Sequence, residues 1–269
     1  MDVLRWIVFG ILPAIAVMLF GVGAGGPRLL AVSLATSICI AAGMLVGWPI
    51  WPWDLSLQHG EPRSWAWWSV LAAGVVGSCH DARVLPRVLT VPAEFAIVAA
   101  LPWLLTGALR ATWTFEQGVV WLLGAGALLL AIWWVLRRVA SLQPGGAVVL
   151  AGAIALLADT LVLRARGHAW DVPAVAVVAL GLALLTTVWR RPFVCGTGAA
   201  LSITIAHAAL LWGGHGERAL LRPAMLLAAV APLAMAVALA KAFAQGRQTG
   251  IVVGVVATAG VAVAAVALA

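Results

Sequence analysis

The sequence predicts an all-α polytopic bundle of helices in a membrane. Of its 269 residues, 64% are hydrophobic and only 9% are charged, and the mean hydropathy is +1.10. A soluble domain carries roughly 25% charged residues, so this chain has too few to cover a surface that faces water. Apolar runs close to the roughly 20 residues that cross a bilayer follow one another almost from end to end. Residues 1–269 are therefore expected to form a single transmembrane domain without a soluble domain.

Ten segments have the apolar character expected of transmembrane helices, although the third is short for a full crossing. The first is predicted to be a retained helix rather than a signal peptide, because its cleavage site is poorly formed and another span follows at once. The ten segments are Leu4–Gly23, Arg28–Gly47, Ser64–Ser78, Ala93–Leu109, Gln117–Leu136, Gly146–Leu163, Pro173–Trp189, Val194–Trp212, Pro223–Ala240 and Gly250–Leu268.

The segments between these spans are too short for an aqueous domain, since even the longest, Trp48–Arg63, cannot build its own core. No nucleotide-binding loop, nucleophile elbow or metal-binding motif is present, so we expect neither a cofactor nor a bound metal. The net charge is +7, but no basic run exceeds two residues. These charges are therefore interpreted as orientation signals beside membrane spans, and no nucleic-acid partner is expected.

The basic residues favour one orientation of the ten spans. Nine Lys and Arg residues fall in the odd-numbered gaps, whereas seven fall in the even-numbered gaps and before the first span. The positive-inside rule then places the odd gaps in the cytoplasm and both termini outside. This assignment requires the third span to cross the bilayer, because its removal would invert every later helix. The predicted location is a bacterial-type inner membrane.

Tryptophan is concentrated around a single predicted outer gap. Its ring is apolar and its N–H remains hydrated, so tryptophan favours the headgroup level of a bilayer. Three prolines, Pro49, Pro52 and Pro62, restrict the backbone of the same segment. We interpret residues 48–68, here called the tryptophan ledge, as an interfacial anchor. A docking surface for a protein partner or a lipid is the alternative. The six tryptophans are Trp48, Trp51, Trp53, Trp65, Trp67 and Trp68.

Three predicted outer gaps share a pattern in which a histidine precedes a carboxylate by two or three residues and a proline follows. Their spacing of roughly fifty residues corresponds to one two-helix hairpin, so a repeated hairpin is one interpretation. The other is that helix starts select acidic residues and proline for capping. A zinc site built from the three histidines is a further, less favoured alternative. The residues are His59 with Glu61, His168 with Asp171, and His215 with Glu217.

Ionisable side chains within membrane spans are costly and often mark functional sites. Asp159 and His207 are expected at similar depth in the outer half of the bilayer, where they could relay protons or form a structural hydrogen bond. Glu94 follows Pro92, and its position predicts a carboxylate in the first turn of a helix.

These features favour three classes of function. A transporter of a small molecule or ion is suggested by the possible repeat and by Asp159 and His207. A non-catalytic membrane subunit or scaffold is suggested equally by the scarcity of catalytic motifs and by the tryptophan ledge. An intramembrane enzyme that modifies lipids is the third alternative. The lipid bilayer is the one partner predicted for all three.

Overall fold

The structure, a computed structural model, is helical throughout the residues that it describes, with no strand among them. It describes residues 37–38, 40–41, 62–81, 83–141, 146–165, 197–213, 223–245 and 247–269. The helices are α4 (Pro62–Asp81), α5 (Arg87–Leu105), α6 (Gly107–Arg110), α7 (Phe115–Ala140), α8 (Gly146–Ala165), α10 (Thr197–Gly213), α12 (Pro223–Val230), the 3-10 helix η3 (Ala231–Met235), α13 (Ala236–Gln245) and α14 (Arg247–Ala267).

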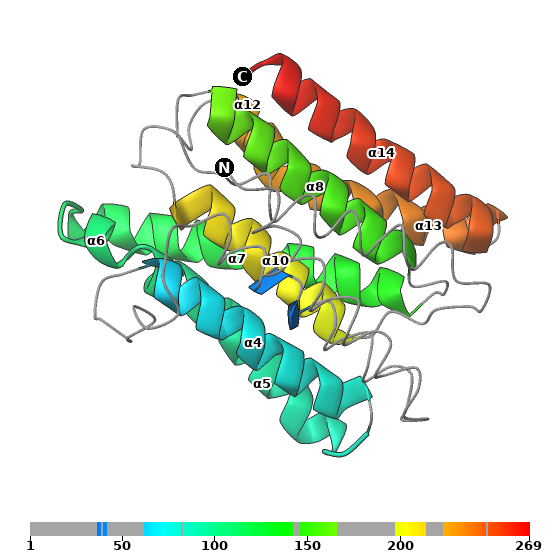
Figure 1. Cartoon of the computed structure of the whole chain (residues 1–269), viewed down its shortest axis with the longest axis horizontal. Coiled ribbons are helices and arrows are strands. Elements are labelled where there is room, and N and C mark those ends of the chain that lie inside the picture. Colours follow the sequence, from blue (N-terminus) through cyan, green and yellow to red (C-terminus); the bar gives the residue numbers. More distant parts are fainter. Residues whose placement is uncertain are drawn as a thin grey trace, which may run out of the picture.

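The helices pack as a layered bundle with α10 near its middle (Figure 1). On one side of α10 lie α4 and α5, and on the other lie α8 and α14, with α12, η3 and α13 packed against α14. Helix α7 packs against both α5 and α10 and so joins the two sides. Helix α10 is therefore in contact with α4, α5, α7 and α8.

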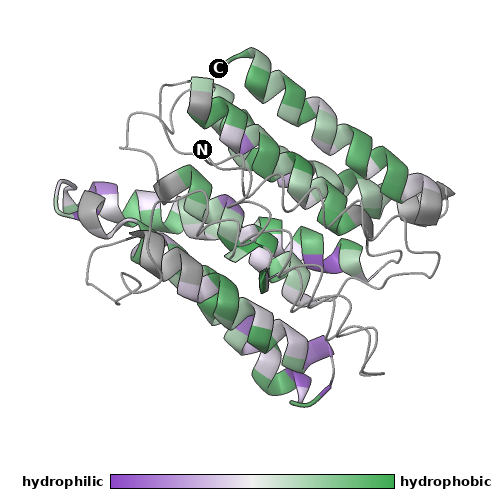
Figure 2. Cartoon of the chain, viewed as in Figure 1, coloured by the Kyte–Doolittle hydropathy of each residue, from purple (hydrophilic) through white to green (hydrophobic). Residues whose placement is uncertain are grey.

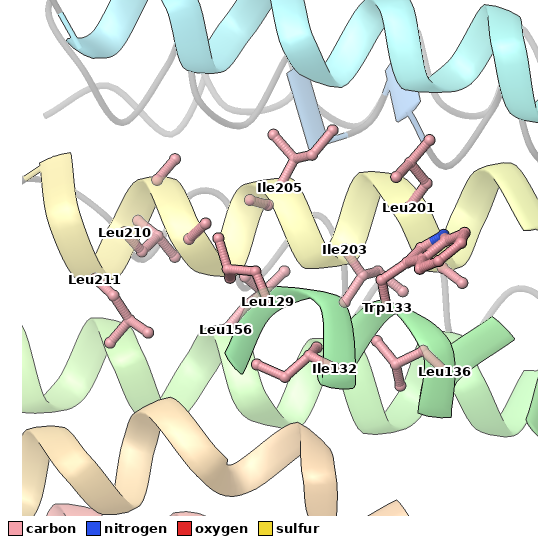
Figure 3. Packing of buried hydrophobic residues seen from close by; sticks show 14 of the residues in the cluster. Leu129, Ile132, Trp133, Leu136, Leu156, Leu201, Ile203, Ile205, Leu210 and Leu211 are labelled. Atoms are coloured by element: carbon pink, nitrogen blue, oxygen red, sulfur yellow. The ribbon is translucent and has the colours of Figure 1, made fainter. Parts of the chain in front are cut away.

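Helix α10 is enclosed by its neighbours, and every residue from position 198 to position 211 is buried. A helix that is apolar on all its faces belongs in the interior of a bundle. Small residues such as Ala199, Ala206 and Ala209 let neighbouring backbones approach closely. Leu201 and Ile205 point to one side of α10 and Ile203 points to the other (Figure 3), and all three side chains are buried.

Most of the described helices are predominantly hydrophobic (Figure 2), and several of their large apolar side chains are exposed. On α14, Val252, Val256 and Val263 are each more than 60% exposed, and Val120 and Leu123 of α7 are about as exposed. Exposed apolar side chains in this number suit lipid rather than water. Among the described residues, four helical segments are long and apolar enough to cross a membrane: Arg87–Leu105, Phe115–Ala140, Pro223–Ala240 and Thr249–Ala267.

Helix α7 has end signals that suit a membrane crossing. Its first turn is closed by a capping box, in which Thr114 and Gln117 bond each other's backbone N–H groups. At the other end, the guanidinium of Arg138 lies 5.4 Å from the ring centroid of Trp134. Phe115 and Trp134 are roughly 28 Å apart along the helix at about 1.5 Å per residue. This separation matches the roughly 30 Å of bilayer hydrocarbon.

Several predicted helix boundaries change. The span predicted as Ala93–Leu109 begins at Arg87, with Pro92 inside the helix. The N–H that Pro92 lacks would bond the carbonyl of Val88, which lies in the exposed first turn, so its loss is tolerated there. The span predicted as Pro223–Ala240 is interrupted by η3. The short third span becomes α4, whose 20 residues extend over about 30 Å.

Other parts of the fold prediction lie outside the described residues. These are the spans Leu4–Gly23 and Pro173–Trp189 and most of Arg28–Gly47. The described helices therefore support an all-helical membrane protein, whereas the number of ten spans and the repeated hairpins stay predictions.

The closest backbone approach along α10 gives a test of this packing. A Cβ atom added to Gly77 of α4 would lie 2.0 Å from the Cα atom of Gly198, and backbone cannot move aside as a flexible side chain can. We expect Gly77→Ala to lower the free energy of unfolding by about 1–3 kcal/mol. Thermal unfolding in detergent, followed by tryptophan fluorescence, measures the change.

Gly124→Ala is the matched control, because a Cβ atom there has no neighbour within 4 Å. Its unfolding temperature should be unchanged or slightly higher, since alanine favours a helix more than glycine. Equal destabilisation by the two substitutions would contradict the packing of α4 on α10.

Candidate functional site

Asp159 and His207 are in direct contact at the centre of the candidate site. Asp159 comes from α8 and His207 from α10, and Oδ2 of the carboxyl group lies 2.5 Å from Nδ1 of the imidazole. The other ring nitrogen, Nε2, lies 3.1 Å from the backbone carbonyl oxygen of Ala229 in α12. Both side chains are fully buried. The site thus joins three helices through a single histidine.

The hydrogen bonds determine how many protons the pair holds. A carbonyl oxygen only accepts, so Nε2 of His207 must carry a proton and donate it to Ala229. One further proton then lies between Nδ1 and the carboxyl oxygen of Asp159. Whether that proton is on the histidine or on the aspartate, the net charge of the pair is zero. A neutral pair avoids the large cost of a net charge buried away from water.

The carbonyl of Ala229 is available because the helix breaks beside it. In a 3-10 helix each N–H bonds the carbonyl three residues earlier, so position 232 would be the donor to Ala229. Position 232 is proline, which has no N–H. Pro232 therefore leaves an acceptor that His207 satisfies from the neighbouring helix. The interruption of the helix and the histidine contact have the same local cause.

One atom of the pair has no partner within the described part of the chain. Oδ1 of Asp159 is buried and accepts no hydrogen bond. An open groove of about 330 Å³ lies nearby between α8 and α14, but it is lined by apolar side chains, including those of Ala158 and Leu161, and Asp159 is not among them. The pair therefore lies in packed helices rather than on the wall of this groove.

A second polar cluster lies where α4 and α5 meet the start of α10. The carboxylate of Asp81, the last residue of α4, accepts the backbone N–H of Thr197 at 2.8 Å and its hydroxyl at 3.0 Å. The N–H of Gly198 lies 3.4 Å from its second oxygen. Asp81 thus caps a helix distant in sequence, where the unpaired N–H groups and the dipole favour an anion.

Glu94 of α5 lies beside this cap, fully buried. Its Oε1 atom is 2.9 Å from Nδ1 of His80, and its Oε2 atom is 3.6 Å from Nε of Arg137 on α7. The hydroxyl of Thr90 also lies 2.9 Å from Nδ1 of His80. Burial lowers the pKa of His80, and the positive charge of Arg137 acts in the same direction, whereas Asp81 opposes it.

The position of Glu94 corrects its predicted role. The sequence placed it in the first turn of a helix that begins after Pro92, but α5 begins at Arg87, so Glu94 lies in the second turn. Its carboxyl group contacts side chains from α4 and α7 instead of the N-terminus of its own helix.

The predicted outer-loop residues lie outside the part of the chain that the structure describes. These are His59, Glu61, His168, Asp171, His215, Glu217, Trp48, Trp51 and Trp53. Trp65, Trp67 and Trp68 belong to the first two turns of α4, and Trp68 is partly exposed. Among the described residues, no group of three or more His, Cys, Asp or Glu side chains could hold a metal ion.

Sequence reasoning missed some residues of both clusters. Arg137 and Thr197 join the second cluster because the ends of α4 and α7 and the start of α10 lie on one side of the bundle. The orientation assigned from the basic residues places these three helix ends on a common side, and this was the available sequence signal. Ala229 could not be foreseen as a partner of His207, because a backbone carbonyl has no sequence signature. The one available signal was Pro232 inside an otherwise apolar span.

Comparison with known proteins identifies no relative: no family model matches the chain, and neither curated proteins nor solved structures give a match. Any function must therefore be inferred from the side chains and their contacts.

The contact between Asp159 and His207 can be tested by a double-mutant cycle. Asp159→Leu or His207→Leu alone leaves one buried polar side chain without its partner, so each should be strongly destabilising. The double variant removes both groups, and we expect a coupling free energy of about 2 kcal/mol or more. Unfolding of the four proteins in mixed detergent micelles provides the measurement, and strictly additive effects would show that the two side chains do not interact.

Proposed function

We propose that the chain is a multi-pass membrane transporter that couples proton movement to the movement of a small molecule or ion. The observation that carries the proposal is the Asp159–His207 pair, a buried carboxyl–imidazole contact that holds one transferable proton. Ionisable residues within membrane helices are rare and commonly form proton relays in transporters. The four apolar segments support the membrane location.

The broken helix beside the pair supports transport further. Interrupted helices are a recurrent feature of transporter binding sites, because the break frees backbone groups near the middle of the bilayer. Ala229 is the seventh residue of α12, about 9 Å along the helix from its start. A site at this depth is reached from either side only if the surrounding helices move.

The charge of the pair gives a reason for such movement. If the shared proton is lost, the pair becomes negative, and if a second proton is gained, it becomes positive. Either charge is expensive at a site where both side chains are fully buried, because burial reduces the solvation of an ion. Opening the contact between α8, α10 and α12 would admit water and lower that cost. A change of protonation thereby favours a change of conformation, which is the coupling that a proton-driven transporter requires.

Proton coupling can be measured in inverted membrane vesicles. Respiration builds a pH gradient, and solutes from several classes are added in turn: inorganic cations, organic cations, amino acids and sugars. We expect one class to collapse the gradient in vesicles that contain the wild-type protein. Asp159→Asn should reduce this response to that of vesicles without the protein, because an amide cannot carry the proton.

Thr160→Val is the matched control, since Thr160 is the next residue of α8 and is equally buried, with its hydroxyl bonded to its own helix at Leu156. It should retain the response. No solute-dependent proton movement by the wild-type protein with any class would count against the transporter proposal.

The break at η3 has its own test. Pro232→Ala restores an N–H that can bond the carbonyl of Ala229 and so compete with Nε2 of His207. We expect slower solute-dependent proton movement with unchanged protein yield. Pro223→Ala, at the first residue of α12, is the control, because the missing N–H has no helical acceptor there. Equal rates of solute-dependent proton movement in the two variants would show that transport does not depend on the broken helix.

A non-catalytic membrane subunit or scaffold is the second candidate. It is favoured by the complete burial of both Asp159 and His207, which is also the arrangement of a structural hydrogen bond between helices. In that case Asp159→Asn would lower stability without affecting proton movement, and the wild-type protein would co-purify with a partner. The tryptophan ledge is the surface that we would expect such a partner to contact, so its removal should release the partner.

A further inference from the structure

The second cluster contains ionisable groups that the proposed function does not use. It joins the end of α4, the first turns of α5, the end of α7 and the start of α10. The pair of Asp159 and His207 lies farther along α10, with its histidine roughly 15 Å from Thr197 at about 1.5 Å per residue. The two sites are therefore separate, although one helix contributes to both.

The contacts of Glu94 leave room for a proton on its carboxyl group. Within the described part of the chain, Arg137 is the one permanent cation in contact with Glu94. Asp81 is complemented by the N-terminus of α10 through its bonds to Thr197 and Gly198. Glu94 is fully buried, its Oε2 atom accepts no hydrogen bond from the residues that the structure describes, and Arg137 approaches it only to 3.6 Å.

We propose that His80 and Glu94 form a second proton-binding site, in which His80 passes a proton between water and the buried carboxyl group of Glu94. The inference goes beyond the proposed function, because it rests on a different set of contacts. Glu94 holds the proton, His80 conducts it, and Arg137 partly balances the charge of the carboxylate when the proton leaves.

The exposure of the two side chains gives the relay its direction. The His80 side chain is 10% exposed, whereas that of Glu94 is 0% exposed. A proton taken from water at Nε2 makes the imidazole positive, and the proton on Nδ1 then passes over 2.9 Å to Oε1 of Glu94. The imidazole is again neutral, with its proton on Nε2, and the carboxylate has become a carboxylic acid. Ring rotation or a reverse transfer resets the histidine.

The surroundings of His80 favour rapid release of the proton. Burial lowers its pKa, and Arg137 on α7 and Arg87 on α5 act in the same direction, whereas its neighbour Asp81 raises it. The hydroxyl of Thr90, which lies 2.9 Å from Nδ1 of His80, is uncharged. A histidine that does not keep the proton suits a conductor between water and a buried acid.

Infrared spectroscopy of the full-length protein in lipid tests this site without any substrate or flux. A titration between about pH 4 and pH 9 covers the range in which such a proton exchanges. The carbonyl band of a protonated carboxylic acid should appear and should be absent in Glu94→Gln. In Glu94→Asp the band should be shifted rather than lost, which distinguishes loss of the acid from misfolding. The proposal would be overturned if the Glu94→Gln variant retained every titrating carbonyl band of the wild-type protein.

The relay is tested by the exchange of that proton for deuterium. Transfer to heavy water shifts the acid band, and His80→Gln should slow the shift by about a hundredfold or more, the smaller end of the effect of a general acid–base group. Thr160→Val is the control, since the Thr160 hydroxyl bonds its own helix at Leu156, and it should leave the Glu94 band and its exchange rate unchanged. If His80→Gln exchanges as fast as wild type, His80 is not the route. Because no transport is measured, failure of the transporter proposal would leave this result unaffected.

Discussion

The enclosure of α10 is the constraint on which the rest of the structure depends. Positions 198 to 211 are buried among helices that include α4, α5, α7, α8 and α12, so any polar side chain on this helix must find its partner inside the bundle. Ser202 and Thr204 satisfy their hydroxyl groups with carbonyls one turn earlier in the same helix. His207 has no such local solution, because its ring extends away from its own backbone. It instead requires an acceptor from α12 and a carboxyl group from α8.

The same enclosure explains why small residues and polar residues occur together. Gly77 and Gly198 bring α4 close enough for Asp81 to reach the first N–H groups of α10. Gly152 makes a comparable approach to Ile203 on the α8 side, where a Cβ atom would lie 2.6 Å from that side chain. The close approach of α4 and α8 to α10 thus positions the carboxyl groups of Asp81 and Asp159, and the electrostatic contacts follow from the packing. Without these glycines, neither acid would be expected to reach its partner on α10.

The sequence predicted the parts of this arrangement that depend on composition and helix length. Asp159 and His207 were expected at similar depth, because each lies a similar distance from the outer end of its predicted span. The start of α5 was misplaced because Pro92 resembles a proline in the first turn of a helix. Sequence alone does not show that the carbonyl left without a donor, that of Val88, belongs to an exposed turn. The cap that Asp81 forms on α10 joins residues 116 positions apart. Such a contact depends on which helices pack together, which apolar periodicity does not specify.

The two polar clusters are linked by the rigidity of the helix between them. Thr197 lies at one end of α10 and His207 near the other, and the intervening residues are packed on all sides. A buried helix in such an environment moves as a unit, because its packed neighbours resist local bending. Displacement of α10 that lengthened the His207–Asp159 contact would therefore also alter the bonds from Thr197 and Gly198 to Asp81. That cap is next to the His80–Glu94 contact, so protonation at either cluster would change the electrostatic environment of the other through the position of a single helix.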